Sequence, residues 1–148
     1  MAIEQQTGVG FNGVDFVKVD FESHGRYEGK STIDVAIKPS VFYPKGQEED
    51  SDFVILMDIT LKCKDKFKLT ILALGNFRVG EDLVGEKRKS IINVNAPAIM
   101  FPYVRSFIAN FTSSVGEPTK GGITIPPQFF KGDLEIHSPD KEDSDLIE

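Results

Sequence analysis

The chain of 148 residues contains no tryptophan, a single cysteine and only two histidines. With one thiol, Cys63, it cannot form an internal disulfide, which favours a reducing compartment. No window holds the ~18 uncharged apolar residues that a membrane helix needs, and the N-terminus lacks a basic segment followed by an apolar run. We therefore expect a cytoplasmic protein with neither a membrane span nor a secretory signal.

The residue types of common catalytic sites are equally scarce. Cys63 falls on the apolar face of an expected strand, where it reads as a small buried hydrophobe, and His24 and His137 lie after a strand and in the tail. No Cys or His spacing suits zinc, and no Walker loop is present. The run GVGFNG, Gly8 to Gly13, matches the dinucleotide fingerprint in letters only, because a strand-like segment follows it instead of a helix. We expect no enzyme, no metal site and no cofactor.

Basic charge is in the minority, with 17 Lys and Arg against 23 Asp and Glu and a net charge of −6. A surface of that sign repels phosphate backbones, so nucleic acid is not an expected partner. The short basic run at 87–89 is most simply a solvated loop.

Four segments alternate apolar and polar residues as the strands of an antiparallel sheet do. Only Asp65 and Lys66 lie between the alternating residues of the third segment and those of the fourth, which predicts a tight hairpin. Leu72, Leu74, Phe77 and Val79 add more apolar surface than one helix would cover. The predicted strands span residues 14–22, 31–44, 51–65 and 66–77.

One long helix is expected within 93–116, because its apolar residues recur in two parallel stripes with polar residues on the remainder. Pro102 is compatible with the helix if it lies in the first turn, and Gly116 is a suitable end. The stripes consist of Ile99, Tyr103, Phe107, Phe111 and Val115, and of Met100, Val104 and Ile108.

Composition divides the chain into three parts. Residues 1–13 are polar and Gly-rich and are expected to be flexible, and residues 14–130 form one domain. Residues 131–148 carry an excess of acids, so little order is expected in that tail.

The segment PAIMFPYVRSFIANFTSSVG, followed by ITIPPQFF, resembles the SecB family of export chaperones. That family opens its long helix with a P-x-x-x-F-P-Y-x-R segment, matched here by Pro97, Phe101, Pro102, Tyr103 and Arg105. The strand pattern and the Gly-aromatic step in LGNFRV also agree, so the resemblance covers roughly residues 14–130.

The resemblance implies an α+β subunit, a four-stranded antiparallel sheet with one long helix, that assembles through sheet edges and helices into a homotetramer, a dimer of dimers. It also implies an ATP-independent chaperone, of the kind used in protein export, whose partners are unfolded polypeptides. Client-binding groove candidates are Tyr27, Ile33, Val35, Ile37, Phe77 and Val79. Oligomer interface candidates are Ile99, Met100, Tyr103, Val104, Phe107, Ile108 and Phe111. Any one of the groove candidates could equally be an ordinary core residue.

The sequence also departs from the family. No second, C-terminal helix is evident, and the acidic surface that docks the SecA translocase motor keeps Glu22 but has Lys18 and Thr70 where acids are expected. Docking to SecA is therefore left open. The alternative is a dedicated interaction or scaffold protein of the same fold, such as a toxin–antitoxin-associated chaperone with one fixed partner.

Overall fold

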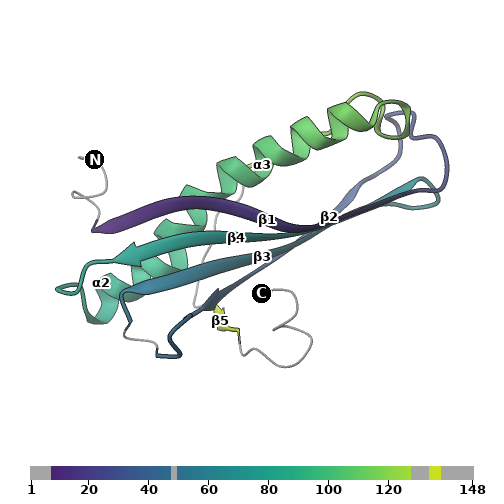
Figure 1. The fold of residues 1–148 in the computed structure, drawn as a ribbon. Coiled ribbons are helices and arrows are strands. Elements are labelled where there is room, and N and C mark those ends of the chain that lie inside the picture. The colour runs from purple at the N-terminus through teal and green to yellow at the C-terminus, as the bar shows by residue number, and fades with distance from the viewer. Residues whose placement is uncertain (1–7, 48–49, 128–133, 138–148) are drawn as a thin grey trace.

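The computed structural model describes residues 8–47, 50–127 and 134–137 (Figure 1). Within these ranges the strands are β1 (Val9–Ser23), β2 (Asp34–Phe42), β3 (Asp52–Cys63), β4 (Phe67–Val79) and β5 (Glu135–Ile136). The helices are α2 (Gly85–Ser90) and α3 (Ala96–Val115), joined by a π-helical turn, Ile91–Asn95, and a 3-10 turn, Glu117–Thr119, follows α3.

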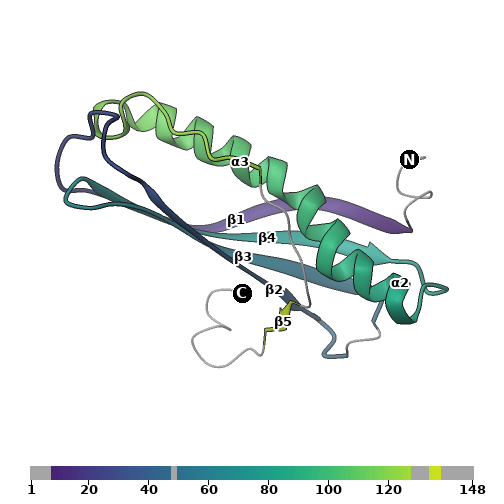
Figure 2. The ribbon, with the colours of Figure 1, turned by 180° about the vertical axis from the view of Figure 1, so that it is seen from behind.

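The strands form one sheet in the order β1-β4-β3-β2-β5, and α3 lies diagonally across one face of it (Figures 1 and 2). The four long strands pair antiparallel, as predicted, whereas β5 pairs parallel to β2. The α+β class with one long helix is therefore confirmed, but the sheet has a fifth strand and is mixed. This strand comes from the acidic tail, where two residues are too few for any alternation to indicate a strand.

The first strand begins earlier than the sequence indicates. Residues 9–13, assigned to the N-terminal segment, form the start of β1, where Val9 pairs with Val79. Register shifts between Phe11 and Val14 and between Phe16 and Lys18 let the strand bend along its whole length. Of the predicted terminal segments, residues 1–7, 131–133 and 138–148 lie outside the described residues.

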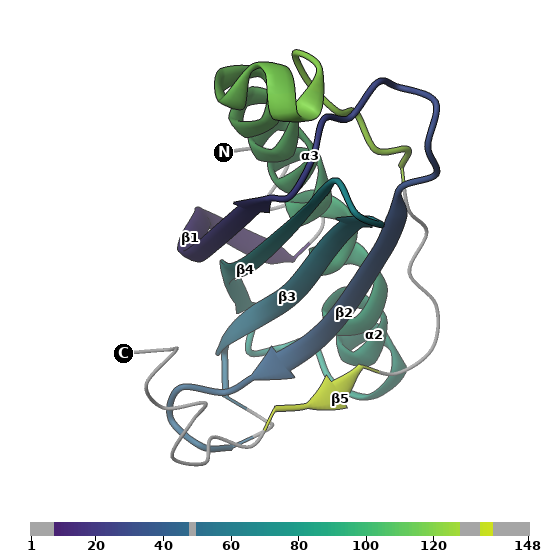
Figure 3. The ribbon, with the colours of Figure 1, turned by 90° about the vertical axis from the view of Figure 1, so that its right-hand side faces the viewer.

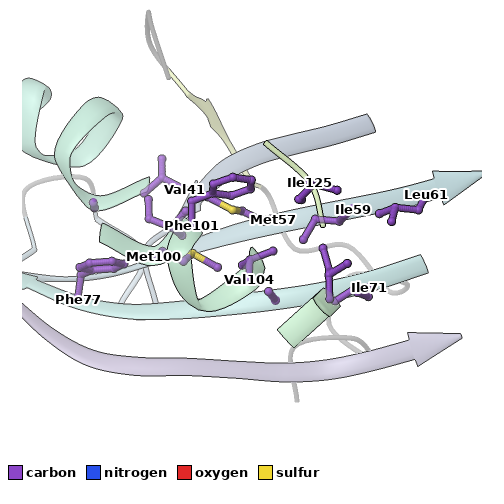
Figure 4. Close-up of a cluster of buried hydrophobic side chains, with 14 of the residues drawn as sticks. Val41, Met57, Ile59, Leu61, Ile71, Phe77, Met100, Phe101, Val104 and Ile125 are labelled. Atoms are coloured by element: carbon purple, nitrogen blue, oxygen red, sulfur yellow. The ribbon is translucent and has the colours of Figure 1, made fainter. Parts of the chain in front are cut away.

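The core lies between α3 and the face of the sheet beneath it, hereafter the helix face (Figure 4). Alternation along β3 places every second residue from Phe53 to Cys63 on this face, and all six are buried. Phe77 and Val79 share the helix face with Ala73, so they are core residues of this chain. On the opposite face, Leu56, Leu72 and Leu74 form a smaller buried cluster with Phe42 and Val54 against them, as the excess apolar surface of β4 predicted.

The helical stretch also starts earlier than predicted. α2 and the π-helical turn precede α3, so Pro102 is the seventh residue of α3 and the prediction that it lies in the first turn is wrong. Its missing N–H leaves the Ala98 carbonyl without a helical donor. Ala98 and Pro102 are both exposed, so water can satisfy that carbonyl. Ala96 directly follows the π-helical turn and donates its N–H to the Ile91 carbonyl, and Pro97 comes next.

Close approach of α3 to the sheet depends on Gly75 of β4. A methyl group placed there would lie 2.7 Å from Sδ of Met100 and 2.9 Å from the Phe77 ring, both buried. Any side chain at residue 75 would therefore push α3 away from β4. The Gly-aromatic step seen in the sequence thus lies inside β4, where it makes room for the helix.

We predict that Gly75→Ala lowers the free energy of unfolding by about 1–3 kcal/mol, because the new methyl group overpacks the Met100 contact. Denaturant unfolding followed by circular dichroism measures the change. Gly10→Ala on β1 is the matched control, since its added methyl would meet nothing closer than 3.8 Å. Equal stability of the two variants would contradict the role of Gly75.

Candidate polypeptide-binding surface

Three of the predicted groove residues gather along one edge of the sheet. Ile33 directly precedes β2, and Val35 and Ile37 lie on its helix face opposite Leu61 and Ile59. Ile33 and Ile37 pack partly against the core, while Val35 is 38% exposed. We call Ile33, Val35 and Ile37 the β2 rim.

Beside this rim, no strand of the described residues pairs with the outer edge of β2. In a strand, the N–H and C=O groups of alternate residues point to the same side. The Val41 carbonyl accepts the N–H of His137 from β5 at 2.7 Å, so Val35, Ile37 and Pro39 point their backbone groups to that same outer side. Pro39, which lacks an N–H, suits this outer side, where the strands that the structure describes do not require that donor. Among the described residues, only Ser40 and Val41 of β2 pair with β5.

The segment after α3 forms the apolar neighbour of the rim. It returns along the helix in Figure 2, and Figure 4 places the buried Ile125 beside Ile59 and Leu61, the partners of the rim residues. Arg105 holds this segment in place, because its Nε donates to the Ile125 carbonyl at 2.9 Å. Thr112 adds a second tie by accepting the N–H of Ile123 at 2.8 Å. Arg105, a residue of the SecB-like segment, thus shapes the apolar surface next to β2.

Tyr27, another of the groove candidates, lies in the connection from β1 to β2. Its ring meets Phe67 edge-on at a centroid distance of 5.7 Å, at the end of the sheet where β2 begins. The hollow beside it, about 310 Å³, is otherwise lined by charged side chains, Arg26, Glu28, Lys30, Glu117 and Lys120. This lining suits salt-bridged surface residues better than an apolar client. Phe77 and Val79, near the opposite end of the sheet, do not join the rim.

The predicted interface residues of α3 divide between two surroundings. Met100, Val104 and Ile108 are fully buried against the sheet of the same chain, so they are core residues. The other stripe packs on three phenylalanines of β1 and leaves Tyr103 52% exposed. The ring pairs are Phe11 with Tyr103 at 5.2 Å, Phe16 with Phe107 at 4.0 Å and Phe21 with Phe111 at 5.9 Å, and Ile99 is likewise partly buried.

Two exposed valines of β1 form an apolar surface feature that the sequence pattern does not indicate. β1 is an edge strand, and Val17 and Val19 are 45% and 38% exposed on it. Strict alternation would place both on the face of Phe21, but the register shift between Phe16 and Lys18 falls at Val17 and separates it from that alternation. Only the strand pairing reveals this bulge.

The remaining predicted positions lie apart from the rim. Glu22, the candidate contact for SecA, pairs with Lys68 on the face away from α3, and its carboxylate is 3.4 Å from His24 Nε2. Cys63 is buried in the core, whereas the His24 side chain is exposed. In the described part of the chain, no group of three or more His, Cys, Asp and Glu side chains is arranged to hold a metal ion. Within the same part, none of the helices has the length and apolar character required to cross a membrane.

Comparison with known proteins supports the resemblance seen in the sequence. The chain is 32% identical over 96 residues to the protein-export protein SecB of Anaplasma phagocytophilum, covering 58% of this chain and 61% of that one. An uncharacterized protein of Methanocaldococcus jannaschii is 29% identical over 103 residues, covering 66% and 63%. The match thus spans less than two thirds of the length of either relative, and no protein-family model matches.

A solved structure supports the fold. The SecB-like chaperone of Mycobacterium tuberculosis, in complex with a ChAD peptide from the HigA1 antitoxin, superposes with a TM-score of 0.63. The superposition covers 82% of this chain and 96% of that one at 16% identity. The chain is SecB-like in both sequence and fold. The P-x-x-x-F-P-Y-x-R segment stabilises this SecB-like fold, because Phe101 is buried in the core and Arg105 donates a hydrogen bond to the Ile125 carbonyl.

We predict that Tyr103→Glu and Phe107→Glu behave differently. Phe107 stacks on Phe16 at an interplanar angle of 12°, so its loss should lower the free energy of unfolding by about 3 kcal/mol or more. Tyr103 is half exposed, so Tyr103→Glu should leave stability nearly unchanged and lower the native mass only if α3 takes part in assembly. Thermal unfolding and sedimentation velocity measure the two effects. A Phe107→Glu variant as stable as the parent would show that this aromatic contact contributes little.

Proposed function

We propose that this protein is an ATP-independent holdase chaperone that binds unfolded or non-native polypeptides along the β2 rim. The observation that carries the proposal is the coincidence of incompletely buried apolar side chains and outward-pointing backbone groups on the same residues, Val35, which is exposed, and Ile37, which is partly buried. A holdase must retain many sequences, so its site should combine apolar contacts with backbone hydrogen bonds, neither of which depends on a particular client side chain. The SecB-like fold supports this assignment.

The same proposal includes assembly into a homotetramer. The edge of β1, with Val17 and Val19 exposed on it, offers both backbone groups and apolar side chains to a second copy. Tyr103 on α3 is the helix residue best placed for the second interface. For a role in protein export, Glu22 is the candidate contact for SecA, although the Lys68 beside it weakens the acidic character of that surface.

The second candidate is a dedicated chaperone with one fixed partner. It is favoured by the structural similarity to a chaperone whose complex contains an antitoxin peptide. The two candidates differ in breadth, because a holdase retains several unrelated unfolded chains whereas a dedicated chaperone retains one.

We predict that the protein suppresses the aggregation of several chemically denatured clients at near-stoichiometric amounts without nucleotide, as measured by light scattering. Val35→Lys should weaken suppression about tenfold, because burying a valine side chain contributes roughly 1.5 kcal/mol or more and 1.4 kcal/mol is a factor of ten. Lysine is well tolerated at sheet edges, so the variant should still fold.

Val84→Lys is the matched control, since Val84 is also an exposed valine but lies on the connection before α2. If neither the parent nor the control suppresses client aggregation, although both are shown to be folded, the holdase proposal is contradicted. Suppression of a single client would favour the dedicated chaperone. Equal loss in both lysine variants would remove the β2 rim as the site.

A further inference from the structure

The C-terminal residues 134–137 occupy the edge of β2 just beyond the rim (Figure 3). Glu135 pairs with Ser40 and Ile136 with Val41, in parallel orientation. Since Val41 faces the helix side of the sheet, Ile136 does so too, and alternation places Leu134 on that side as well. His137 takes the opposite side, where its ring meets Phe42 at a centroid distance of 6.3 Å. The segment therefore sits as an added strand with apolar residues at alternate positions.

Hydrogen bonds donated by two backbone N–H groups and an apolar contact help to hold this segment, in addition to its pairing with β2. The N–H of His137 donates to the Val41 carbonyl at 2.7 Å, and the N–H of Leu134 donates to Oδ1 of Asn93 at 2.7 Å. Leu134 packs partly buried against the core. Asn93 belongs to the π-helical turn before α3. Besides joining two helices, this turn therefore presents a side-chain acceptor to the strand at the edge of β2.

The pairing of β5 with β2 is weak in comparison with the pairing between the other strands of the sheet. β5 has two residues, both exposed, and Ile136 is 49% exposed. Parallel pairing is somewhat less stable per residue than antiparallel pairing, and segments with few buried contacts open at low free energy. By contrast, β2 pairs with β3 over nine consecutive residues. Release of β5 therefore leaves the remainder of the sheet intact.

We propose that residues 134–137 are the chain's own occupant of a strand-addition site, and that a client segment takes their place on the edge of β2. The client segment would be extended, parallel to β2 and apolar at alternate positions, as Leu134 and Ile136 are. Asn93 and the Val41 carbonyl accept its backbone N–H groups, and the rim continues the apolar contact along β2. This inference rests on the proposed function, because it assigns the direction and residue pattern of the client.

Because residues 134–137 compete with clients for the edge of β2, they lower the apparent affinity for clients. When a site is available in only a fraction of the molecules, the apparent affinity falls by that fraction. A site that residues 134–137 leave open about one tenth of the time would bind clients about tenfold more weakly than a site that is always open. It would also keep the edge of β2 from pairing with other folded copies while no client is present.

A labelled peptide with the sequence of residues 132–138, GDLEIHS, tests the site in the full-length chain by fluorescence anisotropy. Leu134→Asp removes the apolar anchor of the tethered segment and should raise the affinity for the peptide about tenfold over the parent. His137→Pro removes the N–H that bonds Val41 and should act in the same direction. Glu28→Gln is the control, because Glu28 is exposed in the connection between β1 and β2, outside β5, and should leave the affinity unchanged. A peptide with serine in place of its leucine and isoleucine should not bind.

Equal affinity of the peptide for the parent and for both edge variants, with thermal unfolding showing all three folded, would overturn the inference. The same variants in the light-scattering assay separate it from the proposed function. Stronger suppression by Leu134→Asp than by the parent supports both, and unchanged suppression overturns the competition between tail and client. If no variant suppresses aggregation yet the peptide binds Leu134→Asp more tightly, the strand-addition site stands and the holdase function fails.

Discussion

The contact between α3 and the sheet, made possible by Gly75, is the constraint on which the rest of the structure depends. Met100, Val104 and Ile108 are buried without residual exposure against the helix face of β3 and β4. Because close-packed interiors do not yield to added volume, the depth of the helix is set where Met100 meets Gly75. The position of α3 then decides where Arg105 holds Ile125 and where Tyr103 faces β1.

The two edges of the sheet follow from this arrangement and differ in character. At one end of the strand order, β1 curves along the helix, and its phenylalanines pack against Tyr103, Phe107 and Phe111 of the same chain. At the other, Val41 of β2 is buried in the core. The rim residues pack less completely, since Ile33 and Ile37 are only partly buried and Val35 is exposed. The surface proposed for clients therefore exists because one helix covers the middle of the sheet and one edge, leaving the second edge partly bare.

Much of the fold was predictable because the strands obey a period of two and the helix a period near four. The burial of every second residue of β3 and the β3–β4 hairpin follow directly from that pattern. The start of β1 and the existence of β5 did not, because a bulged strand loses its alternation and a two-residue strand has none to show. The interior position of Pro102 was missed because the π-helical turn extends the helix backward through residues without an amphipathic pattern.

The sequence by itself determined which residues are apolar, how they alternate and which short segment is SecB-like, since these depend only on composition and spacing. It could not determine what each apolar stripe faces. Met100 and Tyr103 both sit on predicted stripes of one helix, yet one is buried on the sheet and the other is half exposed beside β1. Likewise, Val35 and Phe77 alternate alike in their strands, but only tertiary packing leaves the first at a bare edge and encloses the second beneath the helix. Periodicity specifies the face of an element, and only the packing of elements specifies what covers that face.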